Sequence, residues 1–197
     1  MSASPQPQEN RELAAAGIET PRLLLRAFQP SDVDDIFEYA SDPEVTKHVR
    51  FVTHKSTDDT RAFLKLMEEN RRAGSSVVWA VTLRSNGKVI GSVGFVCWTP
   101  AHRRAELGYA LNRHYWDQGY ASEAVAALVA HGFSALDLNR IEAFVSPAHR
   151  PSQRVLEKCN FQPEGLLRQH ELIKGRWHDS RLYAILRHDF EKRADGH

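Results

Sequence analysis

The segment from residue 104 to residue 146 constrains the fold more than any other part of the chain. The apolar stretch RAELGYAL (104–111) leads into the glycine turn YWDQGY, then a helical pattern over 122–135 and the buried-looking stretch RIEAFVS. A strand, a helix and a strand in this order predict a parallel pair joined by a right-handed crossover. Ligands bind beyond the carboxyl ends of such strands, which is where the glycine turn lies.

The remaining patterns predict helices and antiparallel hairpins around this unit. RLLLRAF (22–28) predicts the first strand, and a capping box of Ser56 and Asp59 begins a helix that ends at Gly74. Asn86-Gly87 predicts a hairpin turn, and Asn160 is expected to end a helix in the left-handed conformation. The fold class is α/β (α+β), a single domain with a mixed, mostly antiparallel sheet of about seven strands and about four helices. The predicted order is β-α-α-β-β-β-α-β-α-β-β.

Composition excludes several classes of protein. The 197 residues fit one domain, and 26 Lys and Arg against 25 Asp and Glu argue against bulk nucleic acid as the main partner. No apolar run reaches the ~20 residues that span a bilayer, and the N-terminus lacks a secretory signal pattern. Two cysteines suit a reducing compartment. We therefore expect a cytoplasmic protein without a membrane partner, with a flexible tail over 1–17 and a domain over 18–192.

Three segments, taken in order, resemble one known superfamily. ELGYAL…YWDQGYASEA and SPAHRPSQRVLEKCNF…EG, together with the order of elements, are similar to the GNAT acyl-CoA N-acyltransferases. The nearest resemblance is to the RimJ/RimL type, which acetylates protein N-termini, and it covers about residues 18 to 190. This resemblance implies acetyl-CoA as co-substrate, an amine as acceptor and no metal. Ten histidines are present, but no H-E-x-x-H or paired C-x-x-C pattern accompanies them.

The resemblance assigns the CoA site to the glycine turn and its surroundings. The phosphate loop reads [QR]-x-x-G-x-[GA] in the superfamily; this chain has Trp116 first, and Asp117 where the RimJ/RimL branch usually has glycine. Backbone N–H groups at a helix start bind phosphate without a basic side chain, although the turn could also simply cap the helix. The residues expected to contact CoA are Tyr109, Leu111, Gln118, Gly119, Tyr120, Ala121, Ser122, His149 and Ser152.

Two residues are candidates for proton transfer. Glu106 is the candidate base. The alternative is that Glu106 is a structural carboxylate paired with Arg103 or Arg104. Ser152 could donate to the departing sulfur, or its hydroxyl could only satisfy an N–H at the helix start. The position where many GNAT members carry a tyrosine acid is Leu156, so that role is vacant.

The acceptor is the least constrained part of the sequence. Trp98, Trp177 and Asp179 could flank the amine, or could be surface aromatics and a solvated carboxylate. An N-terminal α-amine is the expected acceptor. A small amine (a polyamine, an aminoglycoside or an amine antibiotic) and an acyl-CoA-binding module without catalysis remain open alternatives. The oligomeric state, a homodimer included, is also open.

Overall fold

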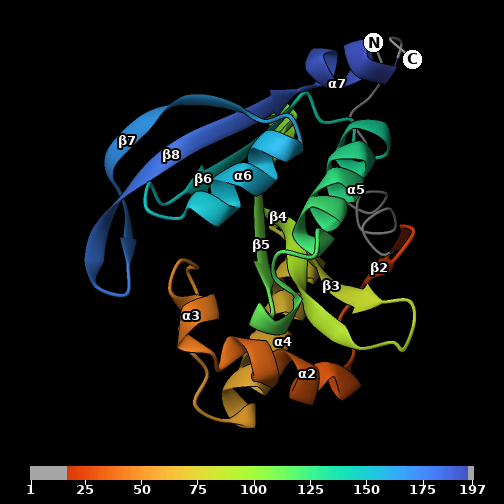
Figure 1. Ribbon diagram of the computed structural model, residues 1–197, viewed down its shortest axis with the longest axis vertical. Coiled ribbons are helices and arrows are strands. Elements are labelled where there is room, and N and C mark those ends of the chain that lie inside the picture. The colour runs from red at the N-terminus through yellow and green to blue at the C-terminus, as the bar shows by residue number, and fades with distance from the viewer. Residues whose placement is uncertain (1–16, 195–197) are drawn as a thin grey trace.

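The computed structural model describes residues 17–194, in which one continuous sheet of eight strands forms the centre (Figure 1). The strand order is β1-β2-β3-β4-β5-β6-β8-β7, and every neighbouring pair is antiparallel except β5 and β6. The predicted mixed, mostly antiparallel sheet is therefore confirmed. The strands are β1 (Ile18–Glu19), β2 (Leu23–Arg26), β3 (Val77–Leu83), β4 (Val89–Thr99), β5 (Arg104–Leu111), β6 (Arg140–Val145), β7 (Gln162–Ile173) and β8 (Arg176–Leu186).

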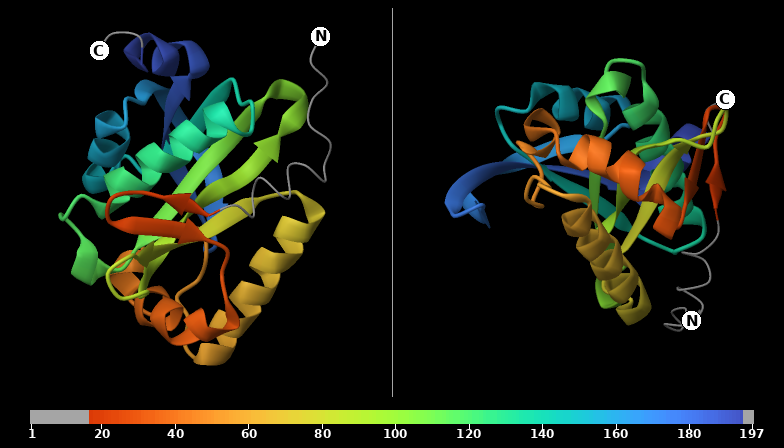
Figure 2. Two further views of the ribbon diagram at one scale, coloured as in Figure 1. Left: turned by 90° about the vertical axis from the view of Figure 1, so that its right-hand side faces the viewer. Right: turned by 90° about the horizontal axis from the view of Figure 1, so that it is seen from below.

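Helices cover both faces of the sheet (Figure 2). On one face, Trp79 and Val81 of β3 pack in a cluster with Leu128, whereas Ala80 between them packs on the other face with Ile36. This alternation follows from the pleat of a strand, which turns successive side chains to opposite faces. The helices are α2 (Val33–Ala40), α3 (Pro43–Thr46), α4 (Thr57–Ala73), α5 (Tyr120–Ser134), α6 (Arg150–Lys158) and α7 (Arg187–Ala194), with 3₁₀ turns at Pro30–Asp32, Pro100–His102 and Arg113–Tyr115.

The local signals in the sequence mark the helix ends and the hairpin turn correctly. Asp59 accepts from the N–H of Ser56 (3.1 Å) at the start of α4, and Gly74 ends that helix with φ 70°. Gly87 (φ 76°) turns the β3–β4 hairpin, and Asn160 (φ 69°) follows α6. These positive φ angles are the conformations for which glycine and asparagine are suited, so short-range chemistry sets these boundaries.

The chain departs from the predicted order at its C-terminal end. The predicted order ends on a strand, but β8 ends at Leu186 and the helix α7 follows it. Arg187, the first residue of α7, donates its guanidinium to the carbonyls of Leu138 (2.9 Å) and Phe133 (2.8 Å), contacts that anchor the start of this helix. The short elements β1 and α3 were also not anticipated. Most of the expected tail, residues 1–16, lies outside the described residues, so the proposed domain limits remain predictions.

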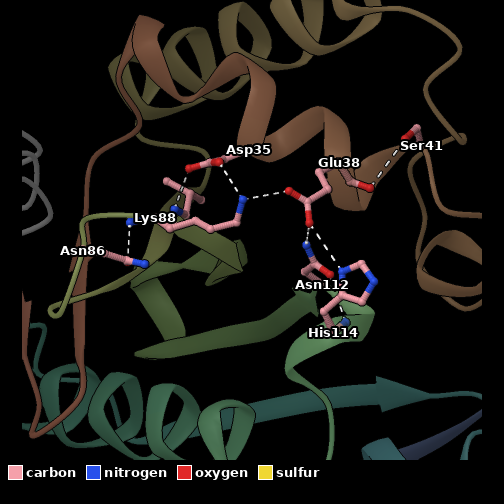
Figure 3. A network of polar contacts seen from close by, with 8 residues as sticks. Asp35, Glu38, Ser41, Asn86, Lys88, Asn112 and His114 are labelled. Atoms are coloured by element: carbon pink, nitrogen blue, oxygen red, sulfur yellow. Dashed lines mark hydrogen bonds and ion pairs between the residues drawn. The ribbon is translucent and has the colours of Figure 1, made fainter.

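A polar network fastens α2 to the sheet near the glycine turn (Figure 3). Lys88 Nζ lies 3.1 Å from Asp35 Oδ1 and 2.8 Å from Glu38 Oε2. Glu38 Oε1 accepts from Asn112 Nδ2 (2.9 Å), and the Asn112 side chain accepts from the backbone N–H of His114 (3.0 Å). The chain leaving β5 is thereby held before it enters the glycine turn.

Candidate active site

The candidate site lies where β5 and β6 diverge. The ladder between them contains three residue pairs, from Arg104↔Arg140 to Glu106↔Glu142. Beyond Glu106 and Glu142, β5 and β6 continue but no longer pair with each other. On the other side of β5, the register with β4 shifts between Phe95 and Cys97, opposite Glu106. The part of β5 beyond Glu106 therefore presents a backbone edge that β6 does not cover, and an extended ligand can pair with such an edge. We call this divergence the fork.

Gly119 precedes α5 in a left-handed backbone conformation. Its φ of 81° is left-handed, and the N–H groups of the first helical turn that follows have no partner within the helix. Trp116, which replaces the usual Gln or Arg, donates its indole N–H to the Leu111 carbonyl (2.8 Å) and so ties the turn to the end of β5. Asp117 is exposed and has φ 57°, a left-handed conformation that glycine adopts without strain.

Arg22 supplies a positive charge at the glycine turn that sequence reasoning missed. Its guanidinium donates to the Gln118 carbonyl (2.9 Å) and to Glu123 Oε2 (2.6 Å), and lies 4.3 Å from the centre of the Tyr120 ring. Burial raises the pKa of Glu123, but hydrogen bonds from Thr20 and Arg22 outweigh it and lower that pKa overall. No local pattern reveals Arg22, because it stands 101 residues before Glu123. An arginine beside a helix start suits a diphosphate.

The other residues expected around the turn have structural contacts of their own. The Gln118 side chain donates to the His114 carbonyl (2.8 Å), and the Ser122 carbonyl accepts from Cys159 Sγ (3.4 Å). Tyr120 and Ala121 are half-buried against the core cluster under α5. These contacts connect the turn to its neighbours. CoA contacts remain predicted for the backbone groups of Gln118, Gly119, Tyr120, Ala121 and Ser122.

Tyr109 and Ser152 form a partly buried hydroxyl pair beside the fork. Tyr109 Oη lies 2.7 Å from Ser152 Oγ and 3.1 Å from the Ser152 carbonyl oxygen. Burial raises the pKa of Tyr109, so its phenol stays protonated at neutral pH. The sequence suggested only backbone contacts for Tyr109. In the fold, its hydroxyl contacts Ser152, which is one helical turn before Leu156, and the Leu156 side chain is buried in the core.

Glu106 is paired, but not with the arginines expected from the sequence. Arg50, in the loop after α3, places Nη2 2.6 Å from Glu106 Oε1. Arg103 instead pairs with Asp137 and Arg104 with Glu142, so the expected local pairing is wrong. Arg104 and Glu106 are two positions apart on the strand, so their side chains lie on the same face of the sheet. On that face, Arg104 pairs with Glu142 rather than with Glu106. Burial raises the pKa of Glu106, with Arg50 opposing.

His149 stacks on a second histidine at the start of α6. Its ring centre lies 4.3 Å from that of His48, with 18° between the planes. Burial and the charge of His48 lower the pKa of His149 to about 4, so its ring is neutral at pH 7. A neutral imidazole has one N–H to donate, which keeps the predicted contact with the pantetheine arm chemically feasible.

The expected acceptor residues do not converge on one point. Trp177 is 61% exposed on the β7–β8 hairpin, and Trp98 is half-buried against the core. Asp179 accepts from the backbone N–H of Gln169 (2.8 Å), where the β7–β8 register shifts. Tyr183, four residues after Asp179, is buried in the core and donates to Glu157 (3.1 Å). Asp179 therefore has a structural contact, and the acceptor roles of these residues remain predictions.

Other features of the described residues do not compete with the fork as the candidate site. A groove of about 720 Å³ lies between residues 27–33 and α4, away from the fork. Within residues 17–194, no group of three or more His, Cys, Asp or Glu side chains is arranged to hold a metal ion. Over the same range, no helix is both long enough and apolar enough to cross a membrane.

Comparison with known proteins identifies the fold and the chemistry together. The family model for the acetyltransferase (GNAT) domain matches residues 22–162. An uncharacterized N-acetyltransferase, p20 of Bacillus licheniformis, is 37% identical over 171 residues, which are 87% of this chain and 96% of the relative. A GNAT-family acetyltransferase from Bacillus anthracis has a TM-score of 0.78 at 32% identity, over 88% of this chain and 99% of that structure.

A more distant relative has a known acceptor. The [ribosomal protein uS5]-alanine N-acetyltransferase of Escherichia coli (strain K12) is 24% identical over 178 residues, or 88% of this chain and 92% of the relative. The fold, the fork and these similarities define an acyl-group transferase. The chain belongs to the GNAT family of N-acetyltransferases, whose members use acetyl-CoA, and ribosomal-protein acetyltransferases are among its homologues, as the sequence resemblance implied.

Proposed function

We propose that this protein transfers the acetyl group of acetyl-CoA to the N-terminal α-amine of a protein or peptide. The observation that carries the proposal is the division of side chains along β5. Tyr109 packs with the cluster under α5 and contacts Ser152 of α6, whereas Glu106, an odd number of positions away, faces Arg50 on the other side. One strand thus separates a donor side from an acceptor side, and the two substrates can meet at the fork between them.

The donor side offers groups suited to each part of CoA. Acetyl-CoA supplies an activated acyl group on a thiol leaving group. The first turn of α5 and Arg22 would hold its diphosphate, and the uncovered edge of β5 with His149 would hold the pantetheine arm. Ser152 Oγ would donate its own proton to the departing sulfur while it accepts from the Tyr109 hydroxyl, 2.7 Å away.

The acceptor side suits an amine that loses its proton easily. Glu106 would take that proton, through a water molecule or directly. An α-amine with a pKa of ~7.8 costs about 1 kcal/mol to deprotonate at pH 7, against about 4.6 kcal/mol for a lysine amine at ~10.4. Burial raises the pKa of Glu106 and Arg50 opposes that rise, so this carboxylate suits the smaller of these two demands.

Ion pairing around Glu106 argues against a polycationic acceptor. A polyamine site would need carboxylates that lack counter-ions. Here Glu142 is paired with Arg104 (3.5 Å) and Arg140 (2.9 Å), and Glu171 with Arg50 (2.5 Å). The uS5-alanine acetyltransferase similarity points in the same direction, toward a protein N-terminus as acceptor.

A thiol-release assay on an amine panel tests the proposal. The panel holds a lysine-free peptide with a free α-amine, a lysine peptide with a blocked N-terminus, spermidine and an aminoglycoside. We expect turnover on the first that exceeds turnover on the others, with mass spectrometry locating the added acetyl group on the α-nitrogen. Preferential turnover on spermidine or the aminoglycoside would replace the α-amine with a small-molecule acceptor. Acetyl-CoA binding without turnover on any of the four would contradict the proposal.

A further inference from the structure

Arg50 connects two carboxylates that lie on different strands, β5 and β7. Its Nη2 lies 2.6 Å from Glu106 Oε1 on β5 and 2.5 Å from Glu171 Oε1 on β7. Its Nε also donates to Glu171 Oε1 at 2.7 Å. Glu171 is fixed in turn, because its other oxygen accepts from the buried Ser180 hydroxyl (3.1 Å). Glu171 thus holds Arg50 by two contacts, and Arg50 presents one nitrogen to Glu106.

The geometry leaves Glu106 with one oxygen engaged and one directed elsewhere. Arg50 binds Oε1, so Oε2 is the atom that can receive a proton at the fork. A guanidinium that binds one carboxylate oxygen restricts the rotamers of that glutamate. An unpaired glutamate has no such restriction. The contact therefore fixes both the direction and the charge of the candidate base.

The charges around Glu106 would otherwise favour its protonated form. Its side chain is only 15% exposed, and that of Glu171 18%. Glu171 and, from β6, Glu142 face it with like charge, although Arg104 and Arg140 pair with Glu142. Arg50 supplies the opposing positive charge from the loop after α3. Removing that charge would leave a buried carboxylate among two others.

We propose that Arg50, anchored by Glu171, is a positioning residue that keeps Glu106 ionised and oriented for proton acceptance at the fork. The proposal rests on the role of Glu106 as base. A purely structural alternative exists, since Arg50 also joins the loop after α3 to the β7–β8 hairpin. A second bond makes the same connection without touching Glu106, because Lys174 Nζ donates to the Thr46 carbonyl at 2.6 Å. Lys174 is therefore the matched control.

The first test is the pH profile of kcat/KM with the peptide acceptor. We expect Arg50→Met to move the acidic limb upward by about one pH unit or more, a roughly tenfold loss on the acidic side that disappears at higher pH. Arg50→Lys restores a positive charge and should return the limb toward its original position. Lys174→Met should leave the limb unchanged. An equal shift in Lys174→Met and Arg50→Met would show that the contact is only structural.

A second test reads the carboxylate directly and does not depend on turnover. Side-chain carboxyl ¹³C signals of labelled glutamate are followed by NMR during an acid titration, with Glu106 assigned by the signal lost in Glu106→Gln. The Glu106 signal should titrate at higher pH in Arg50→Met than in the wild-type protein. An unchanged midpoint would overturn the proposal about Arg50. Absence of acetyl transfer by the wild-type protein would instead overturn the proposed function, and the NMR result would still decide whether Arg50 sets the charge of Glu106.

Discussion

The two sides of β5 are built in different ways. On the donor side, the turn from Trp116 to Gly119 and the start of α5 are consecutive in the chain, and they offer mainly backbone N–H groups. On the acceptor side, Arg50 and Glu171 meet across 121 residues and act through side chains. Backbone recognition tolerates changes of side chain, whereas an ion-pair network changes with one substitution. The donor side is thus suited to one constant ligand, and the acceptor side to variation among relatives.

The largest expected effect separates chemistry from binding on the acceptor side. Glu106→Gln keeps the shape of the side chain but cannot accept a proton, so kcat on a peptide amine should fall by roughly a hundredfold. Calorimetry should show nearly unchanged acetyl-CoA affinity, because the proposed CoA site lies on the other side of the strand. Glu164 lies on β7 and pairs with Arg140. Glu164→Gln removes this pair and is the control, which should keep full turnover. Unchanged kcat in Glu106→Gln would remove Glu106 as the base.

The second prediction addresses the donor side. Valine at position 119 disfavours the left-handed backbone, and its Cβ would lie 3.3 Å from Arg22 Nη2. The turn should shift, the N–H groups should no longer converge, and the Kd for CoA should rise about tenfold or more. Gly74→Val is the matched control, since Gly74 has φ 70° with no atom near its Cβ position. It should lose roughly 1–3 kcal/mol of stability but bind CoA normally.

Equal weakening of CoA binding in Gly119→Val and Gly74→Val would mean that general destabilisation, and not the turn, causes the loss. An unaltered Kd in Gly119→Val would contradict the assignment of the diphosphate to this turn.

The third prediction concerns the hydroxyl pair on the donor side. Tyr109→Phe removes the hydrogen bond to Ser152 and should lower kcat by up to about tenfold while costing about 1 kcal/mol of stability. Tyr183→Phe removes a comparable bond from another buried tyrosine, to Glu157, and should cost similar stability with full activity. Loss of activity in both variants would show that packing, rather than the Ser152 contact, is responsible.

The fourth prediction uses the stack that joins the two sides. The pKa of His149 falls from 6.5 to about 4 on folding, so between these values the unfolded chain binds more protons. Stability should therefore decrease as the pH falls from about 6.5 toward 4. His149→Asn should flatten that decrease in urea unfolding measured across this range, and His102→Asn, at an exposed site, should not. A wild-type slope retained in His149→Asn would assign the pH dependence to other groups.

The sequence predicted the backbone conformation of the turns and helix ends because these signals are local. Gly119, Asn160 and the Ser56–Asp59 capping box each specify a backbone conformation within a few residues, and each lies where it was expected. The family resemblance added the association of these pieces with CoA. The acceptor side escaped prediction because Arg50 acquires its role only when the loop after α3, β5 and β7 come together. Arg22 escaped for the same reason.

The smallest expected effect tests how far the donor side depends on side chains at all. Asp117 places a negative charge in the turn proposed to hold a diphosphate, at a backbone φ of 57° that glycine adopts without strain. Asp117→Asn removes the charge and keeps the side chain, so any tightening of CoA binding it produces is electrostatic, a few-fold at low salt and less as salt is added. Asp117→Gly should bind at least as tightly and also relieve the strain. If neither variant changes the Kd at low salt, the exposed carboxylate points away from the diphosphate, and recognition on the donor side rests on the backbone and Arg22.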